Sequence, residues 1–227
     1  MFKTLGKMFG KLVASHVELH ASETCPECGS QLAREADGWG DRPRELLRES
    51  EEGSPGVSLH QSDGWHCPNP DCPPQVLKRV ALWASPEAMD IQGCDAALVA
   101  QLVNRGLVRD AAEFYRLKYS EIASLEGIDE TKSRALWDAI AASKQRKAWR
   151  VLFGLAIPNI GAAEAQTLCK HFVSLEDLFA MGRERLLRLD GVTEVMARSV
   201  THWYGDPVNR KLVKRLEKAG VNFKTAL

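Results

Sequence analysis

Four cysteines stand in two tight pairs whose spacing suits metal binding. Cys25 and Cys28 are separated by two residues, and Cys67 and Cys72 by four residues that include two prolines. A C-x2-C pair lets two thiolates face one ion, and a second pair completes a tetrahedron of soft ligands that suits Zn²⁺. Four thiolates leave no open coordination position for water, so the spacing predicts a structural zinc site and not a hydrolytic one.

The other histidines and cysteines are weaker candidates for metal ligands or catalytic groups. His60 and His66 lie near the second pair and are spare ligand candidates, and the pairs could instead be redox-active or metal-free. Cys94 and Cys169 stand singly in helical segments, where a cysteine usually acts as a small apolar residue. His171 is two residues from Cys169 and points elsewhere on a helix, so a Cys–His nucleophile is not expected.

The composition is that of an ordinary globular chain. It has 227 residues, of which 44% are hydrophobic and 26% charged, and its formal net charge is zero. The sequence lacks an apolar run of about 18 residues that could cross a bilayer, and its N-terminus lacks the pattern of a secretory signal. We therefore expect a cytoplasmic protein without a membrane span, in which thiols bind metal more readily than they form disulfides. Zero net charge gives no long-range attraction to nucleic acid, which would have to rest on local patches.

Three segments are expected to carry these residues. Residues 1–20 have apolar and lysine stripes at helical spacing, which predicts an amphipathic helix that either docks on the chain or lies on a membrane surface. Residues 21–84 form the predicted zinc module, in which residues 29–66 are a long insertion with one short helix and short strands near the second cysteine pair. Residues 85–227 are predicted to be helical almost throughout.

A unit of one tight turn and one helix recurs four times after residue 85. The turns centre on Gly93, Gly127, Asn159 and Gly191, at spacings of 34, 32 and 32 residues. The helices predicted after them cover residues 96–105, 130–143, 162–171 and 194–203. This pattern is typical of helix-hairpin-helix motifs, in which hairpin N–H groups and a helix N-terminus face a phosphate oxygen without reading the base. A single glycine could merely turn one helix into the next, but four copies favour the motif.

The four hairpins differ at the position just before each helix. Only the third keeps a glycine there, Gly161, whereas the others carry Asp95, Asp129 and Thr193. The two aspartate carboxylates are unfavourable beside a phosphate and could instead cap the helices that follow. Hairpins three and four are therefore expected to be the best phosphate sites. The predicted DNA contacts are Gly93, Gly127, Asn159, Gly161 and Gly191 together with Lys144, Arg146, Lys147 and Arg150 of an acid-free run, and further basic residues follow at Arg210, Lys211, Lys214 and Arg215.

A family resemblance rests on motifs in a fixed order. The stretches CPECGSQL, CPNPDCPPQ, AMDIQG, GLVRDAAEFYRL, ALWDAIAASKQR, RVLFGLAIPNIG and DPVNRKLVKRLEKAGV resemble the zinc-finger and four-fold helix-hairpin-helix region of bacterial NAD-dependent DNA ligase. The resemblance covers roughly residues 23–223. In that family the region follows an oligonucleotide-binding barrel, and the enzyme encircles nicked duplex DNA. The resemblance thus implies a context of DNA repair and replication.

The chain also departs from the family. The adenylation domain with its K-x-D-G lysine, the NAD-binding segment, the barrel and the BRCT domain have no counterpart, and Arg188-Leu-Asp-Gly191 lacks the lysine. An arginine stays protonated and cannot attack an adenylyl phosphate. The insertion between the cysteine pairs is also longer than is usual in the family.

The sequence thus predicts a mostly α-helical protein, with a small four-cysteine zinc module followed by a tandem, four-fold helix-hairpin-helix domain. Its expected function is non-catalytic, non-sequence-specific binding of duplex DNA, with Zn²⁺ as a structural cofactor and no NAD. A separate ligase-like catalytic chain is a candidate partner. The alternative is a degenerate helix-hairpin-helix scaffold that binds a protein or a membrane surface.

Overall fold

The computed structural model describes residues 24–34 and 65–225 of the chain. The chain divides into two compact units, Met1–Pro68 and Asn69–Leu227. The amphipathic helix predicted over residues 1–20 and the helix predicted within the insertion lie outside the described residues.

The described part of the first unit is a small antiparallel pair of strands with a turn. Strand β1 (Ala33–Arg34) pairs with β2 (Trp65–His66), and Ala33 lies opposite His66. Upstream of β1, Gly29 closes a turn with a positive φ of 72°. Strand β2 confirms the short strand expected beside the second cysteine pair.

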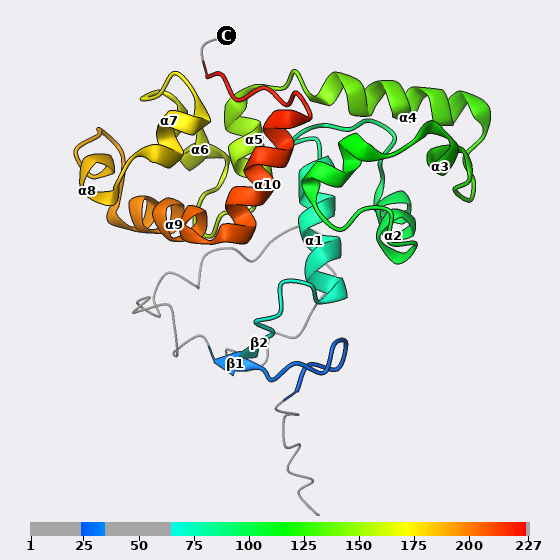
Figure 1. Ribbon diagram of the computed structural model, residues 1–227, viewed down its shortest axis with the longest axis horizontal. Helices are drawn as coiled ribbons and strands as arrows, with labels where there is room; N and C mark the ends of the chain where they lie inside the picture. Colours follow the sequence, from blue (N-terminus) through cyan, green and yellow to red (C-terminus); the bar gives the residue numbers. More distant parts are fainter. Residues whose placement is uncertain (1–23, 35–64, 226–227) are drawn as a thin grey trace, which may run out of the picture. The chain divides into compact units, whose positions relative to one another are not determined.

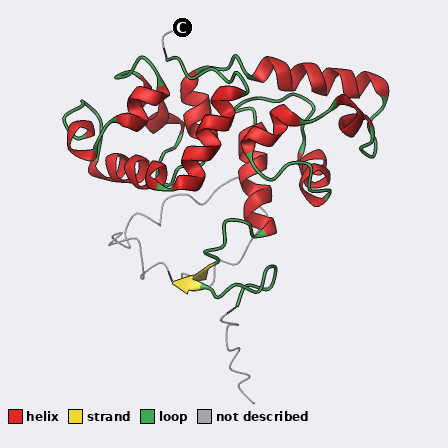
Figure 2. Ribbon diagram, in the orientation of Figure 1, coloured by secondary structure: helices red, strands yellow, loops and turns green. Residues whose placement is uncertain are grey.

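The second unit is helical throughout its regular elements (Figure 2). Its elements in chain order are α1 (Pro73–Ala84), α2 (Ala96–Asn104), the 3-10 helix η3 (Ala111–Arg116), α3 (Tyr119–Ala123), α4 (Glu130–Ser143), α5 (Ala148–Gly154), α6 (Ala162–Cys169), α7 (Leu175–Ala180), α8 (Arg183–Leu186), α9 (Glu194–Gly205) and α10 (Pro207–Lys218). The mostly α-helical fold predicted from the sequence is confirmed. None of the helices in the described part of the chain is long and apolar enough to cross a bilayer.

Helices α5 and α10 lie in the middle of this unit (Figure 1). Elements α2 to α4 lie on one side of them and α6 to α9 on the other. Helix α5 packs on α1 and α6, while α10 packs on α9 and on η3. The first two hairpins and the last two therefore form two halves that share one central layer.

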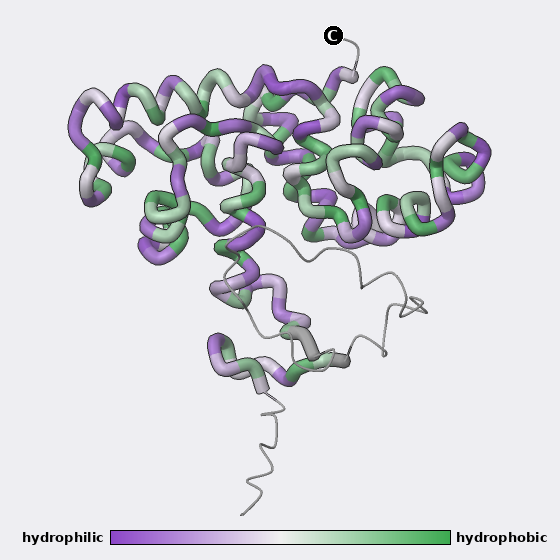
Figure 3. The backbone as a smooth tube through the Cα atoms, turned by 180° about the vertical axis from the view of Figure 1, so that it is seen from behind, coloured by the Kyte–Doolittle hydropathy of each residue, from purple (hydrophilic) through white to green (hydrophobic). Residues whose placement is uncertain are grey.

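One apolar core runs through both halves. Its fully buried side chains include Trp83 of α1, Phe114 of η3, Leu152 of α5 and Leu216 of α10. Hydrophobic and hydrophilic residues alternate along the helical segments (Figure 3), which is the pattern typical of helices that bury one face.

Helix α1 packs with the helical unit, whereas the sequence had grouped its residues with the zinc module. Val76, Val80 and Trp83 recur on one face of α1, and all three are buried in the core described above. Helix α1 contacts α2 and α5. A small metal module has too little apolar surface to cover such a face, which accords with a compact helical unit that begins at Asn69.

Candidate metal centre and nucleic-acid interface

The four paired cysteines come together at one place. The sulfur atoms of Cys25, Cys28, Cys67 and Cys72 all lie within 4.8 Å of one another, and the Sγ atoms of Cys28 and Cys67 are 3.5 Å apart. A tetrahedral ion with Zn–S bonds of about 2.3 Å needs sulfur atoms about 3.8 Å apart. None of the six cysteines forms a disulfide. The sulfur positions therefore fit a shared metal ion.

Local backbone geometry directs both pairs inward. In the first pair the Gly29 N–H donates to the Cys25 carbonyl at 2.8 Å, which closes the turn that carries Cys28. In the second, the Cys72 N–H donates to the Asn69 carbonyl at 3.1 Å, and Cys72 is the N-cap residue directly before α1. Thiolate charge at this helix N-terminus is stabilised by the helix dipole.

The spare ligand candidates His60 and His66 are not needed to complete a set of four donors. Among the described residues, the candidate metal-binding group contains cysteines only. His66 lies in β2, and His60 falls outside the described residues. The expected four-cysteine set thus accounts for the donors without a histidine.

The four turns predicted at Gly93, Gly127, Asn159 and Gly191 all have a positive φ at that residue. Their φ angles are 79°, 74°, 59° and 73°. Each turn residue stands three residues before the first residue of α2, α4, α6 and α9, respectively. A positive φ is easy for glycine and tolerated by asparagine, which explains why Asn159 can replace glycine in the third copy.

Side chains cap three of the four helices that follow the turns. The carboxylate of Asp95 accepts a hydrogen bond from the Leu98 N–H, and that of Asp129 from the Lys132 N–H, both at 2.8 Å. The Thr193 hydroxyl accepts from the Met196 N–H at 3.2 Å. The capping role predicted for the two aspartates is confirmed, and Thr193 caps its helix in the same way. Hairpins one and two therefore carry a negative charge at the helix N-terminus, whereas the cap in hairpin four is neutral.

The third hairpin is capped from inside its own helix. Gly161 has φ −84° and ψ −172°, an extended conformation open to any residue, so its backbone angles do not require glycine. Its N–H donates to the Glu164 carboxylate at 3.0 Å. A Cβ placed on Gly161 would lie 2.8 Å from that carboxylate, so the Glu164 side chain covers the face of the hairpin that the missing Cβ leaves open.

Two arginines of the predicted basic run are bound inside the second unit. Arg146 forms an ion pair with Asp90 at 2.6 Å and donates to the Met89 carbonyl. Arg150 donates to the carbonyls of Pro86 and Ala88 at 2.6 and 2.9 Å. Both guanidinium groups therefore fix the segment between α1 and the first hairpin.

The remaining cations of the basic stretches differ in their surroundings. The Lys144 ammonium lies over the Tyr115 ring at 5.6 Å, whereas Lys147, at the start of α5, is exposed. Arg210 donates to the carbonyl of Gly205 at the end of α9, and Arg215 forms an ion pair with Asp110. Much of the positive charge in these stretches is thus engaged within the protein.

Comparison with known proteins extends these observations. A family model described as "Helix-hairpin-helix motif" matches residues 150–213. A DNA ligase of Rubrobacter xylanophilus is 36% identical over 206 residues, which is 91% of this chain and 27% of the relative. A DNA ligase of Aquifex aeolicus is 36% identical over 198 residues, covering 87% of this chain and 24% of the relative. One from Methylacidiphilum infernorum is 32% identical over 210 residues, covering 92% and 27%.

The chain is homologous to one region of DNA ligases. It spans about a quarter of the length of the curated relatives it matches. The resemblance proposed from the cysteine and hairpin motifs is therefore confirmed. Within this ligase-like chain, the helix-hairpin-helix match begins in α5 and ends in α10, so it covers the third and fourth hairpins.

The two single cysteines of the ligase-like chain pack against its core. Burial raises the pKa of the Cys94 thiol to about 12, and the neighbouring Asp95 carboxylate adds to the shift. Burial likewise raises the pKa of the Cys169 thiol to about 12. A nucleophilic cysteine needs a lowered pKa, so both thiols suit the apolar role expected of them.

One residue of the ligase-like hairpins was missed by the sequence reasoning. Glu164 stands three residues after Gly161, and this spacing is the signature of a capping box. The three-residue spacing can be read from the sequence, but a capping box usually begins with serine or threonine, and here its first residue is glycine.

Proposed function

We propose that this chain binds duplex DNA through its hairpin backbones without reading base sequence. The observation that carries the proposal is the four-fold recurrence of a left-handed turn three residues before a helix N-terminus. Such turns bring N–H groups and the positive end of a helix dipole to a phosphate, and phosphates are the same in every sequence. The similarity to DNA ligases supports DNA as the partner.

We assign the main phosphate contacts to hairpins three and four. Carboxylate caps at Asp95 and Asp129 oppose a phosphate at the first two hairpins, whereas the fourth is capped by the neutral hydroxyl of Thr193. The third hairpin also meets a carboxylate, that of Glu164, but this longer side chain starts inside the helix and can swing away from the Gly161 N–H. Because few phosphates are neutralised, binding should be weak, and the binding constant should fall by about 0.9 log unit per log unit of salt for each contact.

The test is a salt titration of the metal-loaded protein against fluorescent duplexes of unrelated sequence. Gly191→Ala should weaken binding to all duplexes equally, because Gly191 forms the left-handed turn of the fourth hairpin. Gly220→Ala is the matched control, since Gly220 also has a positive φ, 83°, but lies after α10 and outside the hairpins. Absence of binding at low salt by folded protein would reject the proposal.

The proposed cofactor is one structural Zn²⁺ ion held by Cys25, Cys28, Cys67 and Cys72. Four soft donors at tetrahedral spacing favour zinc over the harder divalent cations. When bound, the ion cross-links the two cysteine pairs, and these thiolates leave it no position for a substrate or a catalytic water.

We further propose that this chain has no nick-sealing activity of its own. The segment most like an adenylation motif is Arg188-Leu-Asp-Gly191, which lacks lysine and belongs to the fourth hairpin. Incubation with NAD labelled in its adenylyl group should leave no acid-stable adduct on the protein, and such an adduct on this segment would contradict the proposal.

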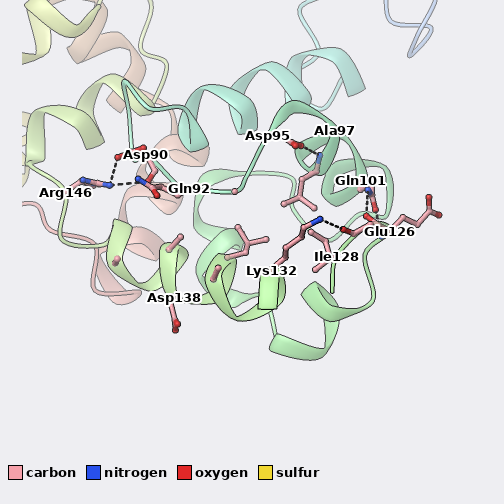
Figure 4. A pocket seen from close by; sticks show the side chains of 17 residues that line it. Asp90, Gln92, Asp95, Ala97, Gln101, Glu126, Ile128, Lys132, Asp138 and Arg146 are labelled. Atoms are coloured by element: carbon pink, nitrogen blue, oxygen red, sulfur yellow. Dashed lines mark hydrogen bonds and ion pairs between the residues drawn. The ribbon is translucent and has the colours of Figure 1, made fainter. Parts of the chain in front are cut away.

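A scaffold that binds another protein is the second candidate. A pocket of about 950 Å³ lies between the first two hairpins and α4, with Ala97, Ile128 and Ala139 among its apolar lining (Figure 4). Its lining holds more acidic than basic side chains, among them Asp95 and Glu126, and this excess of negative charge disfavours nucleic acid there. Absence of DNA binding by the folded protein at low salt would favour this candidate.

A further inference from the structure

The third hairpin differs from the other three in which backbone N–H its capping side chain binds. At hairpins one, two and four, the capping side chain belongs to the residue before the helix and accepts from an N–H inside the first turn. At hairpin three, the Glu164 carboxylate accepts from the N–H of Gly161, which belongs to the hairpin itself. This amide is one that a phosphate at the hairpin would need.

The position of the carboxylate reinforces this point. An oxygen of Glu164 lies 2.8 Å from where a Cβ of Gly161 would stand, so the carboxylate rests directly against the glycine backbone. A carboxylate and a phosphate are both anionic oxygen acceptors that favour a helix N-terminus. Two such anions cannot share one N–H donor without strong repulsion.

We propose that Glu164 acts as a built-in competitor of the DNA phosphate at the third hairpin and thereby sets the affinity of this site. The inference rests on the proposed DNA-binding function. Glu164 reaches Gly161 through a side chain with several rotatable bonds and is only partly buried, so it can swing away when a phosphate arrives. The shorter side chains of Asp95 and Asp129 cap the helices that directly follow them and are less able to swing away from the helix N-terminus.

The decisive variant is Glu164→Gln, which removes the charge and retains an oxygen that can cap the Gly161 N–H. Its affinity for duplex DNA at low salt should rise by about two- to fivefold, the range of a single charge at a helix terminus. The gain should shrink as salt is added, because added ions screen the carboxylate. Glu164→Ala, which exposes the amide fully, should bind at least as tightly as Glu164→Gln.

The matched control is Glu121→Gln. Glu121 caps the Lys118 N–H at the start of α3 at 2.7 Å, in the same manner as Glu164 caps Gly161. Both variants raise the net charge by one, but α3 precedes the second hairpin and its N-terminus does not follow a hairpin turn. Glu121→Gln should therefore leave the affinity near that of the parent chain. Thermal melts of all variants show whether each remains folded.

The outcomes separate this inference from the function on which it rests. If the parent chain binds DNA and Glu164→Gln gains no more affinity than Glu121→Gln, the competitor role is wrong and DNA binding stands. If no folded variant binds duplex DNA at low salt, the proposed function fails and the competitor role fails with it. Binding by Glu164→Gln that clearly exceeds both the parent and the control supports the competitor role.

Discussion

Replacing Gly154 with alanine tests how α1 is attached to the helical unit. Gly154 is the last residue of α5, and a Cβ there would lie 2.8 Å from Cε3 of Trp83 and 3.3 Å from the Cβ of Ala88. Trp83 is fully buried and its ring meets Tyr115 edge-on, with ring centroids 6.3 Å apart. The indole therefore has no open space into which it could retreat.

The expected cost follows from two opposing effects. Alanine favours a helix over glycine by about 1 kcal/mol. Forcing an extra methyl group into a close-packed core costs about 1–3 kcal/mol. Gly205→Ala isolates the first effect, because Gly205 ends α9 and a Cβ there would meet nothing within 4 Å. The free energy of unfolding of Gly154→Ala should thus lie about 2 kcal/mol below that of Gly205→Ala, the middle of the packing range.

Thermal unfolding followed by circular dichroism measures the difference. For a chain of this size, 2 kcal/mol corresponds to a gap in Tm of about 4–8 °C between the two variants. In a Trp83→Phe background the cost of Gly154→Ala should be smaller than in the parent chain, because the smaller ring relieves the contact. If Gly154→Ala melts as high as Gly205→Ala, the close packing of α1 on α5 described above is wrong.

Two further predictions concern the cysteines. Elemental analysis should find one Zn²⁺ per parent chain and none in Cys28→Ser or Cys67→Ser. The first unit of these variants should also be less ordered, because the free energy of metal binding is largely the free energy that folds the metal module. A parent protein that is folded but free of metal would contradict this prediction. The rate of alkylation of Cys94 and Cys169 in native protein should be very low at pH 8 and should rise about tenfold for each pH unit towards pH 12. The reason is that the thiolate is the reactive form and the pKa of each thiol is raised to about 12. Mass spectrometry of modified peptides checks this, and alkylation at pH 8 as fast as that of an exposed thiol would argue against the burial of both sulfurs.

The helical repeat could be predicted because its signals are local. The helix predicted over residues 130–143 is α4 with the same bounds, and the helix predicted over 194–203 differs from α9 only at its C-terminal end. Turn glycines and capping residues mark such boundaries through their own backbone preferences. The clustering of the cysteines was predictable for the same reason, since each pair is arranged by its own short turn.

The partners of charged side chains could not be predicted in this way. Arg146 and Arg150 looked like a solvent-exposed basic patch, yet each binds backbone carbonyls more than fifty residues upstream. Likewise, α1 follows the second cysteine pair in sequence but belongs by packing to the helical unit. These outcomes depend on contacts between distant segments, which a local pattern does not encode.

The contact between α10 and η3 has a consequence for how the hairpins unfold. Arg215 of α10 pairs with Asp110, the N-cap residue of η3 more than one hundred residues earlier, and the Asn222 N–H donates to the Lys144 carbonyl. Repeats that touch only their neighbours can fray from either end one copy at a time. Here the last helix closes back on the first half, so neither end can fray alone. Amide hydrogen exchange should therefore give the slowest protons of all four hairpins a common opening free energy, as expected for one cooperative unit built from a repeated sequence.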